Sequence, residues 1–263
     1  MNLLVQHPQI STDYWDTVRM KLARHDYSLQ TIRAYLNQLR AFIQHIQPEN
    51  PAEIHMQEIR RYLDGMVEKS LSRSTVDQAV NALDFFYREV YGRELDLNGF
   101  KRPRKVRRSP EMLSPEEVMR IAVSAENLKH RLMIELAFSA GLRVCELVMV
   151  KVGHLNLERL LLFVPGNGRD RKSRTTIFSA GLTDALARQI GNKKSHEFLF
   201  PSEKGGRLLT RSVGKFFKSA HEASGISKPA TPHSLRRSFA AALLKSGSDP
   251  VKVQTLLGKK TQA

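Results

Sequence analysis

The sequence has little cysteine and tryptophan and no long apolar run. Its 263 residues include one Cys and one Trp. A single cysteine excludes a disulfide framework and any cysteine-rich metal or iron–sulfur site. No apolar run approaches the roughly 18–20 residues that cross a bilayer. Residues 1–12 lack the charged-then-apolar order of a secretory signal, so we expect a cytoplasmic protein that does not bind membranes.

Patterns of several familiar catalytic sites are also missing. The nine His residues are scattered and form neither a His-x-x-x-His nor a Cys/His pattern, which argues against a zinc site. The chain has no Gly-x-x-x-x-Gly-Lys-Ser/Thr loop for nucleotide phosphates. No Asp-rich cluster indicates a magnesium-dependent nuclease. We therefore expect no metal and no cofactor.

Positive charge, by contrast, is abundant. The 42 Lys and Arg against 26 Asp and Glu give a net charge of +16, which favours a polyanionic partner, most simply nucleic acid. Residues 101–110 hold six basic residues and two prolines, which predicts an extended linker. Residues 111–263 hold 25 basic and 13 acidic residues, a net of +12, whereas residues 1–100 hold 11 and 13. The linker is either a solvated tether or a strap along phosphates.

The first hundred residues predict a compact bundle of four helices. Apolar residues recur at helical spacing in 13–25, from Ser28 onward, in 54–67 and from Ser72 onward. Because the aromatic residues follow these stripes, we expect them to form the core rather than to stack on bases.

The second half predicts further helices and one β-hairpin. Ser114-Pro-Glu-Glu is a typical helix start, and an apolar run at 132–139 stops before Gly141. Further helices are expected at 143–150, 179–190, 210–223, 232–246 and 249–257. The helix at 232–246 should bury Phe239, Leu243 and Leu244. The hairpin pairs 160–164 with 174–178, so the fold class is mainly α with a small antiparallel β-sheet.

Three segments of the second half could bind a phosphate. Arg143 follows the turn at Gly141, and Glu146 lies one helical turn further on, where it could orient the guanidinium. His233 and Arg236 share a face at the start of a helix, which suits a phosphate oxygen and proton transfer. Residues 169–174 form the basic hairpin tip. Taken singly, each segment has a simpler interpretation as a surface ion pair or solvated charge.

Taken together, these segments resemble a known family. Gly-Leu-Arg143-x-x-Glu-Leu, the basic hairpin, His233-x-x-Arg236 and Gln254-x-Leu-Leu-Gly258 follow in the order typical of tyrosine site-specific recombinases, also called phage integrases. Residues 27–35 (Tyr-Ser-x-x-Thr-x-x-x-Tyr) and 71–75 (Leu-Ser-x-Ser-Thr) are similar to the SAM-like core-binding domain of that family. Integron-type and Xer-like members are the most similar.

The resemblance implies an organisation and a reaction. Residues 1–100 would be a core-binding domain, 101–110 the basic linker and 111–263 a catalytic domain that is incomplete at its C-terminus. Members of the family close around double-stranded DNA as a C-shaped clamp and assemble as dimers to tetramers on paired sites. They cleave and rejoin strands through a 3′-phosphotyrosyl link, without metal or ATP.

The resemblance also implies roles for five residues. Arg143 and Arg236 match the two arginines that clamp the scissile phosphate, and His233 matches the histidine that assists proton transfer. Lys172 is assigned as the hairpin lysine, with Arg169 as the alternative, because the usual place of that lysine reads Gly-Asn-Gly here. Lys259 stands where the family has His or Trp.

The tyrosine content departs from the family pattern. The six Tyr residues stand at positions 14, 27, 35, 62, 87 and 91, whereas the family nucleophile follows the segment that ends here at Gly258. We therefore expect a chain cut short before its nucleophile. The alternative is a catalytically inactive DNA-binding or regulatory protein on an integrase scaffold. A relative of type IB topoisomerases would need the same tyrosine.

Overall fold

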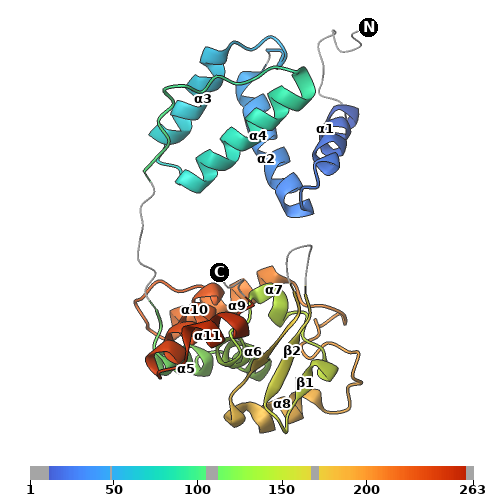
Figure 1. Ribbon diagram of the computed structural model, residues 1–263, viewed down its shortest axis with the longest axis vertical. Helices are drawn as coiled ribbons and strands as arrows, with labels where there is room; N and C mark the ends of the chain where they lie inside the picture. The colour runs from blue at the N-terminus through green and yellow to red at the C-terminus, as the bar shows by residue number, and fades with distance from the viewer. Residues whose placement is uncertain (1–11, 48, 105–111, 167–171, 259–263) are drawn as a thin grey trace. The chain divides into compact units, whose positions relative to one another are not determined.

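The chain forms two compact units, Met1–Arg108 and Ser109–Ala263 (Figure 1). The computed structural model describes residues 12–47, 49–104, 112–166 and 172–258. The fold is mainly helical with one small antiparallel sheet, which confirms the predicted class. The expected boundaries at 100 and 111 stay a prediction, and residues 105–110 of the expected linker lie outside the described residues.

The first unit contains four helices whose starts are set by short polar side chains. Their bounds are α1 Thr12–Arg24, α2 Leu29–Ile46, α3 Met56–Glu68 and α4 Arg73–Tyr91. Ser28 and Ser72 cap α2 and α4, and each hydroxyl accepts a hydrogen bond from a backbone N–H three residues on. The left-handed Gly92 ends α4.

The core of this unit lies between the apolar stripes of its helices. Phe42 of α2 and Phe85, Phe86 and Tyr87 of α4 are almost completely buried. The Tyr87 hydroxyl donates a hydrogen bond to the carbonyl of Pro51 (3.1 Å). The aromatic residues therefore form the core, as their spacing predicted.

The second unit is built around one helix that is buried on all sides from Leu132 to Ala137. Its helices are α5 Pro115–Val123, α6 Leu128–Ser139, α7 Val144–Leu147, α8 Thr183–Ile190, α9 Thr210–Ala223, α10 Pro232–Lys245 and α11 Pro250–Leu256, with short 3₁₀ turns at Val152–His154 and Ala180–Leu182. The central α6 is in contact with α5, α7, α8, α9 and α10. A helical stretch that is buried on every side must be surrounded by other elements in this way.

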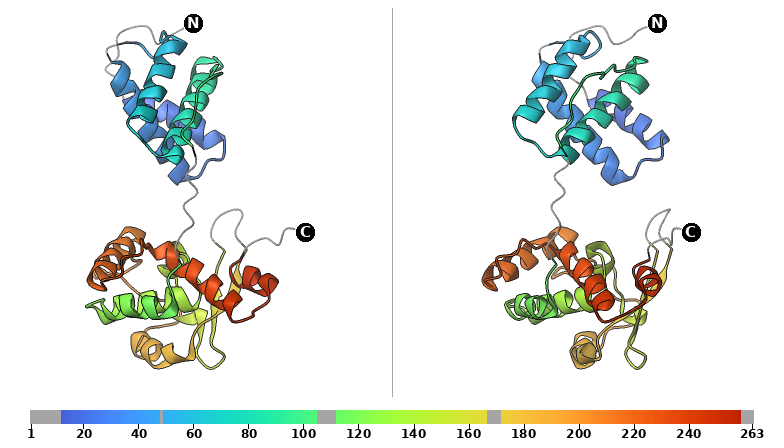
Figure 2. Two further views of the ribbon diagram at one scale, coloured as in Figure 1. Left: turned by 90° about the vertical axis from the view of Figure 1, so that its left-hand side faces the viewer. Right: turned by 60° about the vertical axis from the view of Figure 1, so that its left-hand side comes forward.

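The sheet of the second unit has the order β1–β2–β3, with both pairs antiparallel. Its strands are β1 Leu155–Asn156, β2 Leu161–Val164 and β3 Arg174–Ile177. Val164 is opposite Arg174 at the end of the β2–β3 hairpin where the connecting loop begins. Helix α11 lies beside β3 and also contacts α10 (Figure 2). The hairpin thus brings Arg174 next to the end of the last helix.

Three expectations about the second unit were wrong in detail. The helix predicted at 143–150 is only the four residues of α7, because the chain leaves it to pair with 197–199: Leu199 N–H donates to Val150 O (2.8 Å). The helix predicted at 179–190 begins as a 3₁₀ turn. Leu244 is 47% exposed, since the apolar face of α10 is narrower than its sequence indicated.

Gly141 is required by the turn between α6 and α7. Its φ is +60°, and a Cβ there would stand 2.4 Å from Phe239 Cδ1. We predict that Gly141→Ala lowers the free energy of unfolding by about 3 kcal/mol, the sum of backbone strain and overpacking. Gly247→Ala is the control, because Gly247 also has a positive φ (+85°) but has no atom within 4 Å of the added Cβ. It should cost about 1 kcal/mol. Urea denaturation measures both, and equal losses would contradict the steric argument.

Candidate functional site: one carboxylate among three arginines

The site begins where the left-handed Gly141 ends α6 and the chain enters α7. Arg143 is the N-cap of α7, and Glu146 is its third helical residue. The Glu146 carboxylate accepts the backbone N–H of Arg143 at Oε2 (2.8 Å) and the Arg143 guanidinium at Oε1 (2.7 Å). The i,i+3 pairing that the sequence predicted is therefore present.

A second arginine, Arg174 of β3, binds the same carboxylate. Its Nη1 donates to Glu146 Oε1 (2.9 Å) and its Nη2 donates to Oε2 (2.8 Å), so the pair is bidentate. Its Nε donates to the carbonyl of Leu256 (2.7 Å), at the end of α11. The Arg174 side chain is only 7% exposed.

The third arginine, Arg236 of α10, completes the cluster. Its Nη1 donates to the carbonyl of Gly141 (2.6 Å) and lies 3.6 Å from Glu146 Oε2, and its Nη2 donates to the carbonyl of Leu257. His233 lies one turn earlier on the same helix and is exposed. The structure therefore brings Arg143 and Arg236 together through Glu146, with His233 on the helix that carries Arg236.

The electrostatics of the cluster follow from its composition. Burial alone would raise the pKa of Glu146, but the hydrogen bonds from Arg174 and Arg143 outweigh it and lower the pKa to about 2. Glu146 is therefore ionised at neutral pH. Three guanidinium groups and one carboxylate leave a net charge of +2 in a small volume.

The cluster is not equally accessible on all sides. The Arg143 side chain is 25% exposed, whereas that of Arg236 is 10% exposed. Lys172 is exposed and precedes β3 by two residues. Arg169 and Lys259 lie outside the described residues. An anion would therefore reach Arg143 and His233 most easily.

Sequence reasoning missed Arg174 as a site residue. The signal available was the alternation of β3, in which Arg174 and Thr176 share one face. Thr176 is fully buried and its hydroxyl donates to Ala140 O (3.1 Å). An arginine on the buried face of a strand requires a partner. The acceptors at Gly141, Leu256 and Leu257 are main-chain carbonyl groups, which every residue has. The sequence therefore gives no indication of these three contacts.

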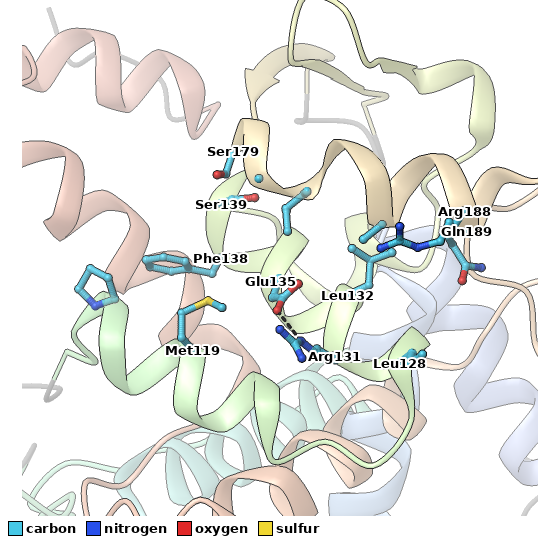
Figure 3. Close-up of a pocket in the computed structure, with 14 residues that line it drawn as sticks. Met119, Leu128, Arg131, Leu132, Glu135, Phe138, Ser139, Ser179, Arg188 and Gln189 are labelled. Carbon is cyan, nitrogen blue, oxygen red and sulfur yellow. Dashed lines mark hydrogen bonds and ion pairs between the residues drawn. The ribbon is translucent and has the colours of Figure 1, made fainter.

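A separate hollow of about 760 Å³ lies over α5, α6 and α8 (Figure 3). Arg131 points to Glu135 there, and the two form an ion pair of 2.9 Å. None of the predicted site residues that the structure describes lines this hollow. Within the described ranges, no group of three metal-binding side chains occurs, and no helix is long and apolar enough to span a membrane.

Comparison with known proteins decides the family. The phage integrase family matches residues 111–262, and its N-terminal SAM-like domain matches residues 15–97. The chain belongs to the phage integrase family. The resemblance seen in the sequence is confirmed. The second half of this integrase-family chain matches the integrase domain, and the first half matches the SAM-like domain.

Individual relatives agree with this membership. An integrase/recombinase from Escherichia coli is 31% identical over 297 aligned residues, which cover 95% of this chain and 87% of that protein. The tyrosine recombinase XerD of Listeria monocytogenes serotype 4b (strain F2365) is 27% identical over 262 residues, covering 92% and 88%.

Solved structures show that this phage integrase family member shares the lambda integrase fold. A lambda integrase dimer bound to a COC′ core site has a TM-score of 0.78 at 22% identity, covering 95% of this chain and 74% of that one. A lambda integrase tetramer bound to a Holliday junction has a TM-score of 0.76 at 23% identity, covering 95% and 77%.

The depressed pKa of Glu146 predicts a pH-dependent contribution to stability. A carboxyl whose folded pKa is about 2 against 4.5 stabilises the fold fully above pH 4.5 and loses this effect as the pH falls toward 2. We expect Glu146→Gln to lower the free energy of unfolding by about 3 kcal/mol at pH 7. This gap from the wild type should narrow below pH 4.5.

Denaturant unfolding of both proteins between pH 3 and pH 7 measures the gap. Glu158→Gln is the matched control, because Glu158 is exposed in the same unit. A gap that stays constant over this pH range would show that Glu146 is not ionised in the cluster.

Proposed function

We propose that this protein binds duplex DNA and acts in site-specific recombination, with the scissile phosphate held at the arginine cluster of the second unit. The observation that carries this proposal is the net charge of +2 around Glu146, with Arg143 partly exposed. The carboxylate fixes the guanidinium groups before DNA arrives, so little reorganisation is needed when a phosphate binds.

The proposed roles follow the chemistry of each group. Arg143 and Arg236 would donate to the non-bridging oxygens, which gain negative charge as the phosphorus becomes pentacoordinate. His233, exposed at the first turn of α10, would assist proton transfer at this phosphate. Lys172 or Arg169 would serve the leaving oxygen from the hairpin tip, and Lys259 would stand at the place of the usual His or Trp.

Assembly and domain roles are proposed on the same basis. Residues 1–100 would grip DNA as a core-binding domain, 101–110 would follow the phosphates, and 111–263 would carry the cluster. Lambda integrase has been solved as a dimer bound to a COC′ core site and as a tetramer bound to a Holliday junction. For this chain we propose homo-oligomers, dimer to tetramer, on paired sites.

A second candidate function is favoured by the environment of the tyrosines. All six stand at positions 14–91, in the helical first unit. Burial raises the pKa of Tyr14, Tyr62, Tyr87 and Tyr91, and the Tyr14 and Tyr91 hydroxyls are hydrogen-bonded to each other (2.9 Å). These groups are poor nucleophiles where they stand. The protein would then bind a recombination site without cutting it, and regulate an active relative at that site. That the chain stops before its nucleophile stays a prediction.

DNA affinity should depend steeply on salt. Each neutralised phosphate contributes about −0.9 to the slope of log K against log salt. We expect Arg143→Gln to weaken duplex binding about tenfold and to reduce the slope by about one. Fluorescence anisotropy with a labelled duplex, selected by this protein from a random pool, measures both quantities between 50 and 300 mM salt.

Arg159→Gln removes an exposed arginine from the same unit and is the control. If it weakens binding as much as Arg143→Gln does, Arg143 supplies only general attraction. If the wild-type affinity is the same at low and high salt, phosphate binding is contradicted.

A nicked suicide substrate built on the selected duplex separates the two candidate functions. Cleavage by a tyrosine would trap a covalent protein–DNA adduct that survives denaturing electrophoresis. From the arrangement of the six tyrosines we expect no adduct with the 263-residue chain. An adduct, mapped to its tyrosine by mass spectrometry, would overturn the non-cutting function and support recombinase activity.

A further inference from the structure

Arg174 is a buried cation for which the family resemblance assigned no role. It lies on β3, its side chain is 7% exposed, and three of its N–H groups have protein acceptors. A group this deeply buried, with three of its five N–H donors engaged, is badly placed to bind DNA directly. Any effect it has on a phosphate must pass through the groups that it holds.

Those groups belong to two different parts of the second unit. The bidentate pair with Glu146 fixes the carboxylate that orients Arg143. The bond from Nε to Leu256 O fixes the last turn of α11, whose next carbonyl, that of Leu257, accepts from Arg236. Two successive carbonyls at the end of one helix are thus held by two arginines that share one carboxylate. Cations are also favourable at a helix C-terminus.

The chain after α11 fits closely against the Arg174 side chain. Gly258 has φ +60°, and a Cβ there would stand 2.9 Å from Arg174 Cδ. The left-handed glycine therefore lets the backbone pass directly over the aliphatic part of the arginine. This contact fixes the backbone of Gly258 against the Arg174 side chain.

We propose that Arg174 is a positioning residue for the phosphate site. It joins β3, α7 and the end of α11, so that Arg143, Arg236 and the last turn of α11 keep one arrangement. Lys172 lies two residues before Arg174 on the same hairpin. The contacts of Arg174 therefore also restrict the backbone from which the Lys172 side chain extends. The effect of Arg174 on DNA binding rests on the proposed function, whereas its hold on α11 does not.

Lysine cannot replace this arginine. The three bonds use Nε and both Nη atoms of one planar group, aimed at a carboxylate and at a carbonyl on separate elements. A lysine ammonium carries its donors on a single atom and cannot span these acceptors. Arg174→Lys keeps the buried charge but loses the connection between α7 and α11.

Hydrogen exchange in the DNA-free protein tests the connection. We expect Arg174→Lys to reduce protection of the amides of Leu257 and Gly258 at least tenfold, while the amides of central α6 keep theirs. Arg159→Lys, on an exposed arginine of the same sheet region, should change neither. Equal losses in α6 and at 257–258 would show general destabilisation, and no loss at 257–258 would show that α11 is held without Arg174. Either result overturns the proposal.

Gly258→Ala provides a second variant that keeps Arg174 itself, should Arg174→Lys fail to fold. Its Cβ would displace the arginine from the last turn of α11 and should give the same local loss of protection. Normal protection at Leu257 in this variant, with Arg174 displaced from the Leu256 carbonyl, would also count against the proposal.

A double-mutant cycle in DNA binding tests the positioning role, which a merely structural role would not reproduce. If Arg174 acts through Glu146 and Arg143, Arg174→Lys should weaken binding five- to tenfold, and Arg143→Gln with Arg174→Lys should bind no more weakly than Arg143→Gln alone. Losses that multiply would overturn positioning of Arg143. Failure of the wild type to bind DNA would instead refute the proposed function, and the exchange result would still decide whether Arg174 holds α11.

Discussion

The second unit depends on one ionised carboxylate that lies among three guanidinium groups. Glu146 is nearly inaccessible to solvent, and its charge is stable only because Arg143 and Arg174 bind both of its oxygens. The arginines in turn would repel one another without it. The carboxylate thus holds three guanidinium groups in fixed positions, and the cluster keeps a net positive charge. The same ion cluster that stabilises the fold is therefore the one to which we assign phosphate binding in the proposed function.

The elements around this cluster are arranged by ordinary packing. The apolar α6 is enclosed by its neighbours, and the left-handed turn at Gly141 delivers Arg143 and Glu146 from its end. Helix α10 contributes Arg236 from a buried position near its start. The hairpin contributes Arg174 by pairing it opposite Val164. Three separate stretches of sequence meet at one carboxylate because each belongs to an element that packs on the same core.

Local sequence signals were sufficient for most helices and for part of the site. Caps such as Ser28 and Ser114 and the apolar stripes of α2 and α4 are short-range features, so helix positions followed from them. The i,i+3 pair of Arg143 and Glu146 is short-range too. Arg174 is 28 residues from Glu146, and no local pattern encodes that pairing. The helix from Arg143 was overextended for the same reason, because its end is set by pairing with the distant segment 197–199.

Arg236 and Arg174 are anchored in part to carbonyl oxygens, those of Gly141, Leu256 and Leu257. Every amino acid supplies such an oxygen, so the partly exposed side chain at Leu256 can be exchanged in evolution without removing the acceptor, whereas the side chain of Leu257 is also buried against Phe239 and Val253. Covariation between the arginines and these anchors should accordingly be weak, even though the atoms are in contact. Selection would act instead on the geometry of the backbone, through the two left-handed glycines that border the anchors, and an engineer who transplants this cluster must copy the turns before the side chains.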